Sequence, residues 1–244
     1  MTKKSVYLRN SVAGAICLAG LTVFSGCNKD DDSSGSGDGN GGNASKITAT
    51  NVINSSSRIV TVKAEDYWYS DYDVIAQAPY KNNGFTLELP ATMAAKYLEP
   101  IEVEEGVTVS DRNAKYYELE EFSGFDKDDE TIGYFYLGDE DDSNVSWLYV
   151  DRDVTVKGEY NYEDYTEKYD VKLKKGWNVV YVIITESYSK GKSVTSQKPS
   201  GINPQWYFDS CSDCRSAEVT TKSIAHTKSV FSQLKENKKI GLKK

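Results

Sequence analysis

Two cysteines three positions apart, Cys211 and Cys214, have a spacing that supports chemistry. A Cys-x-x-Cys pair is compatible with a disulfide, a redox couple or half of a zinc site. The redox couple needs a thioredoxin-like βαβ context and the zinc site needs two more soft ligands, and the sequence offers neither. A small disulfide outside the cytoplasm is therefore the leading interpretation, an unbonded or variable pair is the next, and a redox or metal role is the least favoured.

The sequence has one histidine, His226, and it lies in the basic C-terminal part. A Ser-His-Asp triad, a Cys-His pair and a His-ligated zinc ion are therefore excluded from residues 27–214. The net charge of −8 also argues against nucleic acid as a partner. We expect no enzyme; a carboxylate-based glycoside hydrolase is the class that the 37 acidic residues leave open.

Three oxygen-bearing residues, Asp139, Asp141 and Ser143, have the one-three-five spacing of a calcium loop. The rest of the EF-hand pattern is missing, because the sixth position is Asn rather than Gly and the twelfth is Val rather than Glu. The acidic turn 126–130 would supply further oxygens if the two loops meet. Calcium is thus the one candidate cofactor, and solvated acidic turns are the alternative.

Four aromatic residues, Tyr67, Trp68, Tyr69 and Tyr72, lie within six positions beside aspartates. Exposed rings next to carboxylates can stack on a sugar ring and hydrogen-bond its hydroxyls. Tyrosine is also a favourable strand residue that packs its ring across a sheet. These four residues are the candidate ligand-binding side chains, and ordinary sheet packing is the alternative.

Residues 1–26 have the features of a secretory signal: a basic start and an apolar stretch, 12–24, that is too short to cross a membrane. The segment ends in Phe24-Ser25-Gly26-Cys27, which resembles a bacterial lipobox although Phe24 replaces the usual leucine. The resemblance implies that Cys27 carries lipid and becomes the first residue of the mature protein. The membrane is therefore an expected partner through this anchor.

Residues 27–45 are predicted to be an acidic, Gly/Ser-rich tether, because such a composition cannot bury a core. The Asn28–Asp32 run resembles the export signal of Bacteroidetes lipoproteins. That resemblance implies an outer-membrane location at the cell surface, and the periplasmic face of the membrane is the alternative.

Residues 46–210 alternate between apolar and polar side chains with a period of two, which predicts an all-β body. We expect an antiparallel β-sandwich or barrel-like meander of one or two packed β units, with 46–110 and 114–210 as the candidate sub-units. Residues 177–184 are predicted to form a central strand covered on both faces, and only 91–98 looks helical. Further strands are expected at 47–53, 58–66, 73–79, 84–89, 115–122, 131–137, 144–150, 153–160, 167–173 and 204–208.

Residues 211–244 contain the Cys-x-x-Cys pair and a basic tail. Residues 215–244 carry a charge of +6, against −17 for 27–214. Ile224, Phe231 and Leu234 have near-helical spacing among the lysines. The tail is either a short amphipathic helix that docks on the acidic body or a disordered terminus.

Three segments, Ala78–Leu87, Lys174–Tyr181 and Gln205–Phe208, make the body similar to a family of Bacteroidetes surface lipoproteins. The similarity spans about residues 45–210 and excludes the tail. It implies a β-rich envelope lipoprotein without a known activity. We therefore expect a non-enzymatic binding or accessory module for a glycan or an outer-membrane protein, with a structural or assembly protein of the envelope as the alternative.

Overall fold

Short strands separated by tight turns make up nearly all of the regular structure. The computed structural model describes residues 44–68, 71–119, 121–139, 143–185, 190–211 and 230–231, without the side chains of 67, 68, 71, 72 and 121. The described residues all belong to one unit, Gly35–Lys244. The strands are β1 (Lys46–Ala49), β2 (Thr61–Trp68), β3 (Asp71–Pro79), β4 (Phe85–Glu88), β5 (Glu99–Pro100), β6 (Val107–Val109), β7 (Lys115–Leu119), β8 (Glu121–Phe125), β9 (Thr131–Gly138), β10 (Asn144–Val150), β11 (Val154–Tyr162), β12 (Tyr165–Leu173), β13 (Gly176–Ile184), β14 (Gly191–Thr195) and β15 (Gln205–Ser210).

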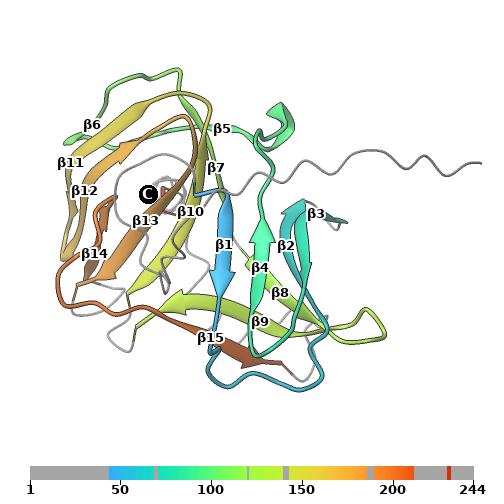
Figure 1. The fold of residues 1–244 in the computed structure, drawn as a ribbon. Coiled ribbons are helices and arrows are strands. Elements are labelled where there is room, and N and C mark those ends of the chain that lie inside the picture. The colour runs from blue at the N-terminus through green and yellow to red at the C-terminus, as the bar shows by residue number, and fades with distance from the viewer. Residues whose placement is uncertain are drawn as a thin grey trace, which may run out of the picture. The chain divides into compact units, whose positions relative to one another are not determined.

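Thirteen of the described strands form one large sheet, while β1 and β4 form a separate pair (Figure 1). The longest path through the large sheet is β3-β2-β8-β9-β10-β13-β14-β12-β11-β6; β15 lies beside β9, and β7 joins β10 to β5. All pairings between the described strands are antiparallel except that of β12 with β14. The predicted all-β, mostly antiparallel fold is confirmed, and the described sheet is open, with β3 and β6 at its ends.

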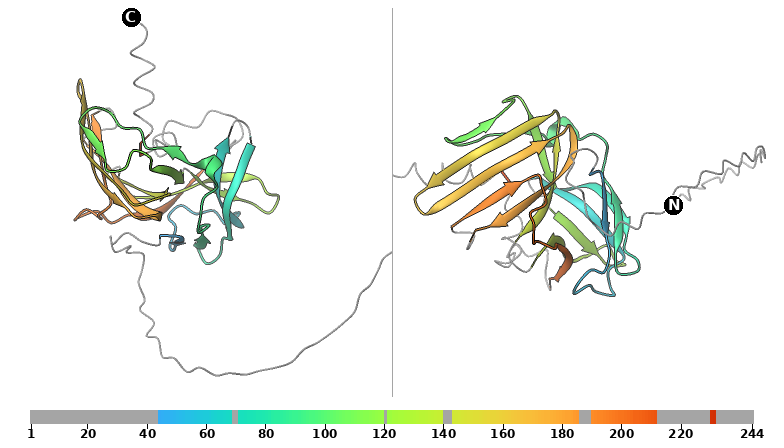
Figure 2. Two further views of the ribbon diagram at one scale, coloured as in Figure 1. Left: turned by 90° about the horizontal axis from the view of Figure 1, so that it is seen from above. Right: turned by 60° about the vertical axis from the view of Figure 1, so that its left-hand side comes forward.

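Two hydrophobic cores lie on opposite faces of the central strands. In β10, Trp147 packs in the first core, with β1, β2, β4, β8, β9 and β15, while Leu148 packs in the second, with β6, β11, β12 and β14. Trp177 and Val180 divide β13 between the cores in the same way. The prediction that 177–184 is a central strand covered on both faces is therefore confirmed. In the left view of Figure 2 the yellow and orange strands around the second core form a curved layer.

The turn between β3 and β4 shows how local sequence sets the register. Asn82 and Asn83 both have positive φ, at 53° and 58°, as the two central residues of a type I′ turn require. Lys81 and Gly84 close the turn with reciprocal backbone hydrogen bonds of 2.9 and 3.1 Å. Gly84 is required there because a Cβ would lie 2.1 Å from the carbonyl oxygen of Ala49.

Three sequence-based expectations differ from the structure. The 91–98 segment is not an α-helix but holds one 3-10 turn, Ala95–Tyr97, because Pro90 and Pro100 leave too few residues for a stable helix. The expected strand 115–122 is divided into β7 and β8, which pair with different partners. The strands β5, β6 and β14 were not predicted. In the part of the chain that is described, we find no helix with the length and apolar character needed to cross a membrane.

Candidate functional site

Only some of the candidate residues from the sequence lie within the described ranges. Cys27, Tyr69, Asp141 and Cys214 lie outside the described residues, as do the signal segment and residues 27–43 of the tether. Cys211 follows β15 and is disulfide-bonded. Its pairing with Cys214 stays a prediction.

Three of the four aromatic candidates are described through their backbone alone. Tyr67 and Trp68 end β2, Tyr72 lies near the start of β3, and Tyr67 pairs with Tyr72 in the antiparallel register. A glycan-binding role for these side chains therefore stays a prediction.

The two acidic loops are occupied by local hydrogen bonds. The Asp139 carboxylate accepts the Ser143 amide at 3.3 Å, and the Asp139 amide donates to the Ser143 carbonyl at 3.0 Å. In the other loop, Asp126 accepts the Asp128 and Glu130 amides at 3.0 and 3.2 Å and pairs with Arg58 at 2.8 Å. Among the described residues no three His, Cys, Asp or Glu side chains are grouped as metal ligands would be. Calcium binding stays a prediction, because it involves Asp141, which lies outside the described residues.

Two paired carboxyl groups on β2 and β3 differ in their pKa. Burial, with the neighbouring charge of Asp73, raises the pKa of Asp66. Hydrogen bonds from Lys96 at 2.6 Å and from Tyr97 at 2.8 Å lower the pKa of Asp73. Such divergence occurs in catalytic acid–base pairs but also in structural ion-pair networks. Asp73 belongs to a network of this second kind, with Lys96 and Tyr97.

The most distinctive polar group of the structure lies in the second core, on the inward face of β12. Tyr165, Glu167 and Tyr169 alternate along this face, and both tyrosine hydroxyls donate to the Glu167 carboxylate, at 2.7 and 2.5 Å. Lys192 of β14 lies opposite Glu167 in the register, and its Nζ is 3.6 Å from Glu167 Oε1. Glu167 is 1% exposed and Lys192 is 4% exposed. Since a buried charge needs a partner, each stabilises the other.

A glycine brings β14 close enough for this pair. Gly191 has a φ of 143°, and a Cβ there would lie 1.9 Å from the Thr166 carbonyl oxygen. The parallel pairing of β12 and β14 therefore requires glycine at this position. Because Lys192 is the next residue, its side chain is directed into the second core beside Glu167.

Lys192 of this group and Glu118 of β7 bind the main chain of Val230, in the C-terminal tail. The Val230 amide donates to Glu118 Oε2 at 2.6 Å, and the Val230 carbonyl accepts from Lys192 Nζ at 3.1 Å. The Tyr169 hydroxyl is also 3.3 Å from this carbonyl, but its one proton is committed to Glu167 at the shorter distance. Glu118 and Lys192 thus satisfy both main-chain groups of one residue, which lies in a turn.

The next residue, Phe231, packs against the rings of Tyr116 and Tyr169. Its ring meets that of Tyr116 edge to face, with centroids 5.0 Å apart, and stacks on that of Tyr169 at 5.9 Å. Val230 and Phe231 are 0% and 3% exposed. Figure 1 shows this short red segment inside the curve of β6, β11, β12 and β13. These two residues therefore pack against the body, while the predicted helix of the tail stays a prediction, since the rest of 222–236 lies outside the described residues.

The tyrosines of this site remain protonated over a wide pH range. Burial, together with the Glu167 charge, raises the pKa of Tyr169 far above its ordinary value of about 10. Burial, the hydrogen bond to Glu167 and the Glu167 charge raise the pKa of Tyr165. Both hydroxyls therefore stay available as donors to Glu167.

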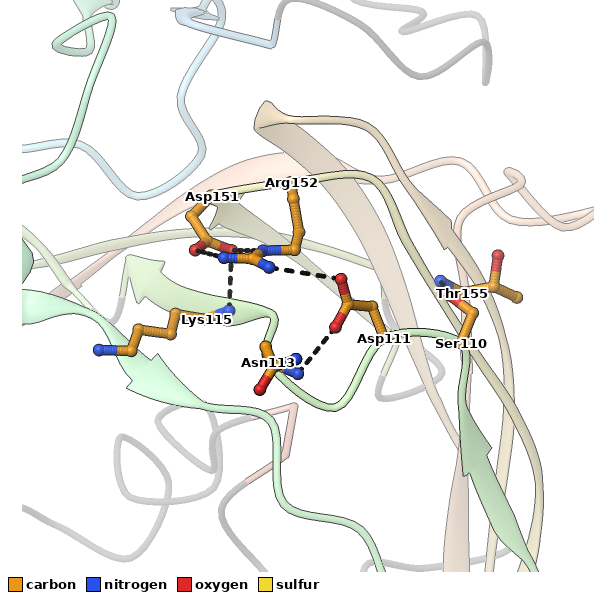
Figure 3. Close-up of polar contacts among 7 residues, drawn as sticks. All are labelled: Ser110, Asp111, Asn113, Lys115, Asp151, Arg152 and Thr155. Carbon is orange, nitrogen blue, oxygen red and sulfur yellow. Dashed lines mark hydrogen bonds and ion pairs between the residues drawn. The ribbon is translucent and has the colours of Figure 1, made fainter.

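A polar network outside the core fixes the strand that carries Tyr116 and Glu118. The β7 strand begins at Lys115, whose amide donates to Asp151 Oδ1 at 2.9 Å. Arg152 bridges Asp151 and Asp111 at 3.1 and 3.4 Å. The pKa of Asp111 is lowered mainly by the hydrogen bond from the Asn113 amide and, to a smaller extent, by Arg152. Figure 3 shows how this network joins the loop before β7 to the turn after β10. It also draws Asn113, and Ser110, whose hydroxyl accepts the Thr155 amide.

The sequence analysis did not identify Glu118, Glu167 or Lys192 as site residues. Glu167 was detectable, because it continues the inward set of Tyr169, Val171 and Leu173 by one step of two residues. A carboxylate at an inward strand position is a signal of a buried partner.

Comparisons of the chain with models of protein families, with curated proteins and with solved structures find no match.

Proposed function

We propose that this protein is a lipid-anchored, non-enzymatic binding module of the outer membrane whose ligand is a short segment of a partner protein. One observation carries the proposal: Glu118 and Lys192 together bond the amide and the carbonyl of a single residue inside the second core. A site that satisfies one main-chain unit on both sides is suited to a peptide. The rings of Tyr116 and Tyr169 contact the side chain of the residue that follows.

The anchoring part of the proposal is supported by the sequence. A lipidated Cys27 followed by a tether would hold the body near the membrane while leaving it free to turn. We propose that the body is displayed at the cell surface; protease treatment of intact cells would degrade a surface-exposed body and spare a periplasmic one.

The binding test uses a chain whose own tail is weakened. We would measure fluorescence anisotropy of a labelled decapeptide with the sequence of residues 226–235 against the full-length Phe231→Ala variant. Saturable binding is expected, because this change leaves the groups that bind the main chain in place. Absence of binding at millimolar protein would contradict a peptide site.

A second substitution identifies the site. Adding Glu118→Gln to the Phe231→Ala chain replaces a charge-assisted hydrogen bond by a neutral one, so affinity should fall about tenfold. Glu159→Gln is the matched control, since that side chain is 46% exposed on β11. Equal effects of the two substitutions would place the peptide elsewhere.

A structural or assembly role is the second candidate, and the open sheet favours it. The described sheet ends at β3 and β6. Edge strands of this kind can pair with strands of other chains. A fixed envelope partner that co-purifies with the Glu118→Gln variant as well as with the wild type would favour this candidate.

A further inference from the structure

We infer that the site selects an aliphatic–aromatic pair of residues, and that Val230–Phe231 is the chain's own competitor for a partner segment of that chemistry. This inference rests on the peptide-binding function proposed above. It adds the ligand class and the regulation of the site.

The first position of the ligand is defined by its surroundings. The Val230 side chain lies fully buried in the second core, and its amide donates to Glu118. A charged side chain here would be buried without a partner. Proline would remove the amide proton that Glu118 accepts. The position therefore favours an aliphatic residue other than proline.

The second position selects a ring. Phe231 is enclosed by Tyr116, edge to face, and by Tyr169, stacked. Offset and edge-to-face pairs add attraction beyond the burial of apolar area. A small polar residue at this position would lose both contacts and leave a cavity between the two tyrosines.

The occupant of the site belongs to the same chain, which makes it a competitor. Tethering to the same molecule gives a segment an effective concentration on the order of 1 mM. An external peptide that binds the open site with a Kd of about 10 μM would then bind the occupied site roughly 100-fold more weakly. A partner must either exceed this affinity or present its segment at a high local concentration, as a protein held at the same membrane does.

The experiment compares full-length wild-type protein with two tail variants, Phe231→Ala and Val230→Pro. The first removes the ring and the second removes the amide donor, and neither alters a residue of the sheet. The probe is the labelled 226–235 decapeptide, with two further peptides that carry Phe→Ser at position 231 or Val→Pro at position 230. Circular dichroism and thermal unfolding establish that each variant is folded.

We expect both tail variants to bind the parent peptide about 100-fold more tightly than the wild type, and the two altered peptides to bind at least tenfold more weakly than the parent. Equal, tight binding by wild type and variants would overturn the competition and leave the peptide site standing. Equal binding of the Phe→Ser peptide would overturn the aromatic selectivity. Failure of both tail variants to bind the parent peptide would contradict the proposed function itself.

Discussion

Truncating Phe231 should release the tail from the body while leaving the body folded. Burial of a phenylalanine side chain contributes about 2–3 kcal/mol, and Phe231 is 3% exposed. Its contacts with Tyr116 and Tyr169 add about 0.5–1.5 kcal/mol. Phe231→Ala should therefore weaken docking by about 3 kcal/mol, which is roughly a 100-fold change in the docking equilibrium.

Hydrogen exchange at the Val230 amide measures this change directly, because that amide is bonded to Glu118 in the docked tail. We expect its protection to fall about 100-fold in Phe231→Ala and much less in Phe231→Leu, which keeps most of the apolar area. Amides of β13 provide the internal control and should keep their protection. Unchanged protection at Val230, or an equal loss in β13, would refute the calculation.

Three further predictions concern the buried pair, the tyrosines and the anchor. Lys192→Met leaves the Glu167 charge without its cation and should cost about 3–5 kcal/mol, or roughly 10 °C in Tm; the added change Glu167→Gln should restore part of that loss in thermal unfolding. The raised pKa values of Tyr165 and Tyr169 mean that the stability they contribute is intact below about pH 10 and is lost as the pH rises above it. For buried Tyr169 the slope is about 1.4 kcal/mol per pH unit, so urea unfolding between about pH 9 and pH 11 should show a shallower decline for Tyr169→Phe. Cys27→Ala should release the protein from membranes, and membrane attachment that persists would contradict lipidation at this residue.

The strands that sequence reasoning located are those whose burial follows from a local pattern. In β12 and β4 the apolar residues alternate in step with the burial of the strand. In β13 a run of apolar residues marks burial on both faces. A period of two is a property of the strand itself, so it can be read without knowing its neighbours.

The β14 strand could not be predicted in this way. Its sequence, Gly191–Thr195, contains one large apolar residue, Val194, and a lysine that is buried. What makes it a strand is its position between β12 and β13, a non-local pairing. Its lysine is accepted in the core because Glu167 lies opposite it.

The candidate site depended even more on distant contacts. The Val230 amide and Glu118 are separated by 112 positions, and Val230 and Lys192 by 38. No periodicity connects residues so far apart, so the sequence could show that Phe231 was suited to docking but not where it would dock.

Photo-cross-linking from position 231 tests the central claim most directly. A p-benzoylphenylalanine in place of Phe231 in the full-length chain would be irradiated, and the cross-linked peptides would be mapped by mass spectrometry. The account predicts cross-links within one chain to the β7 and β12 segments that contain Tyr116 and Tyr169. Cross-links to other segments, or only between two chains, would contradict the claim that the tail occupies this site in its own molecule.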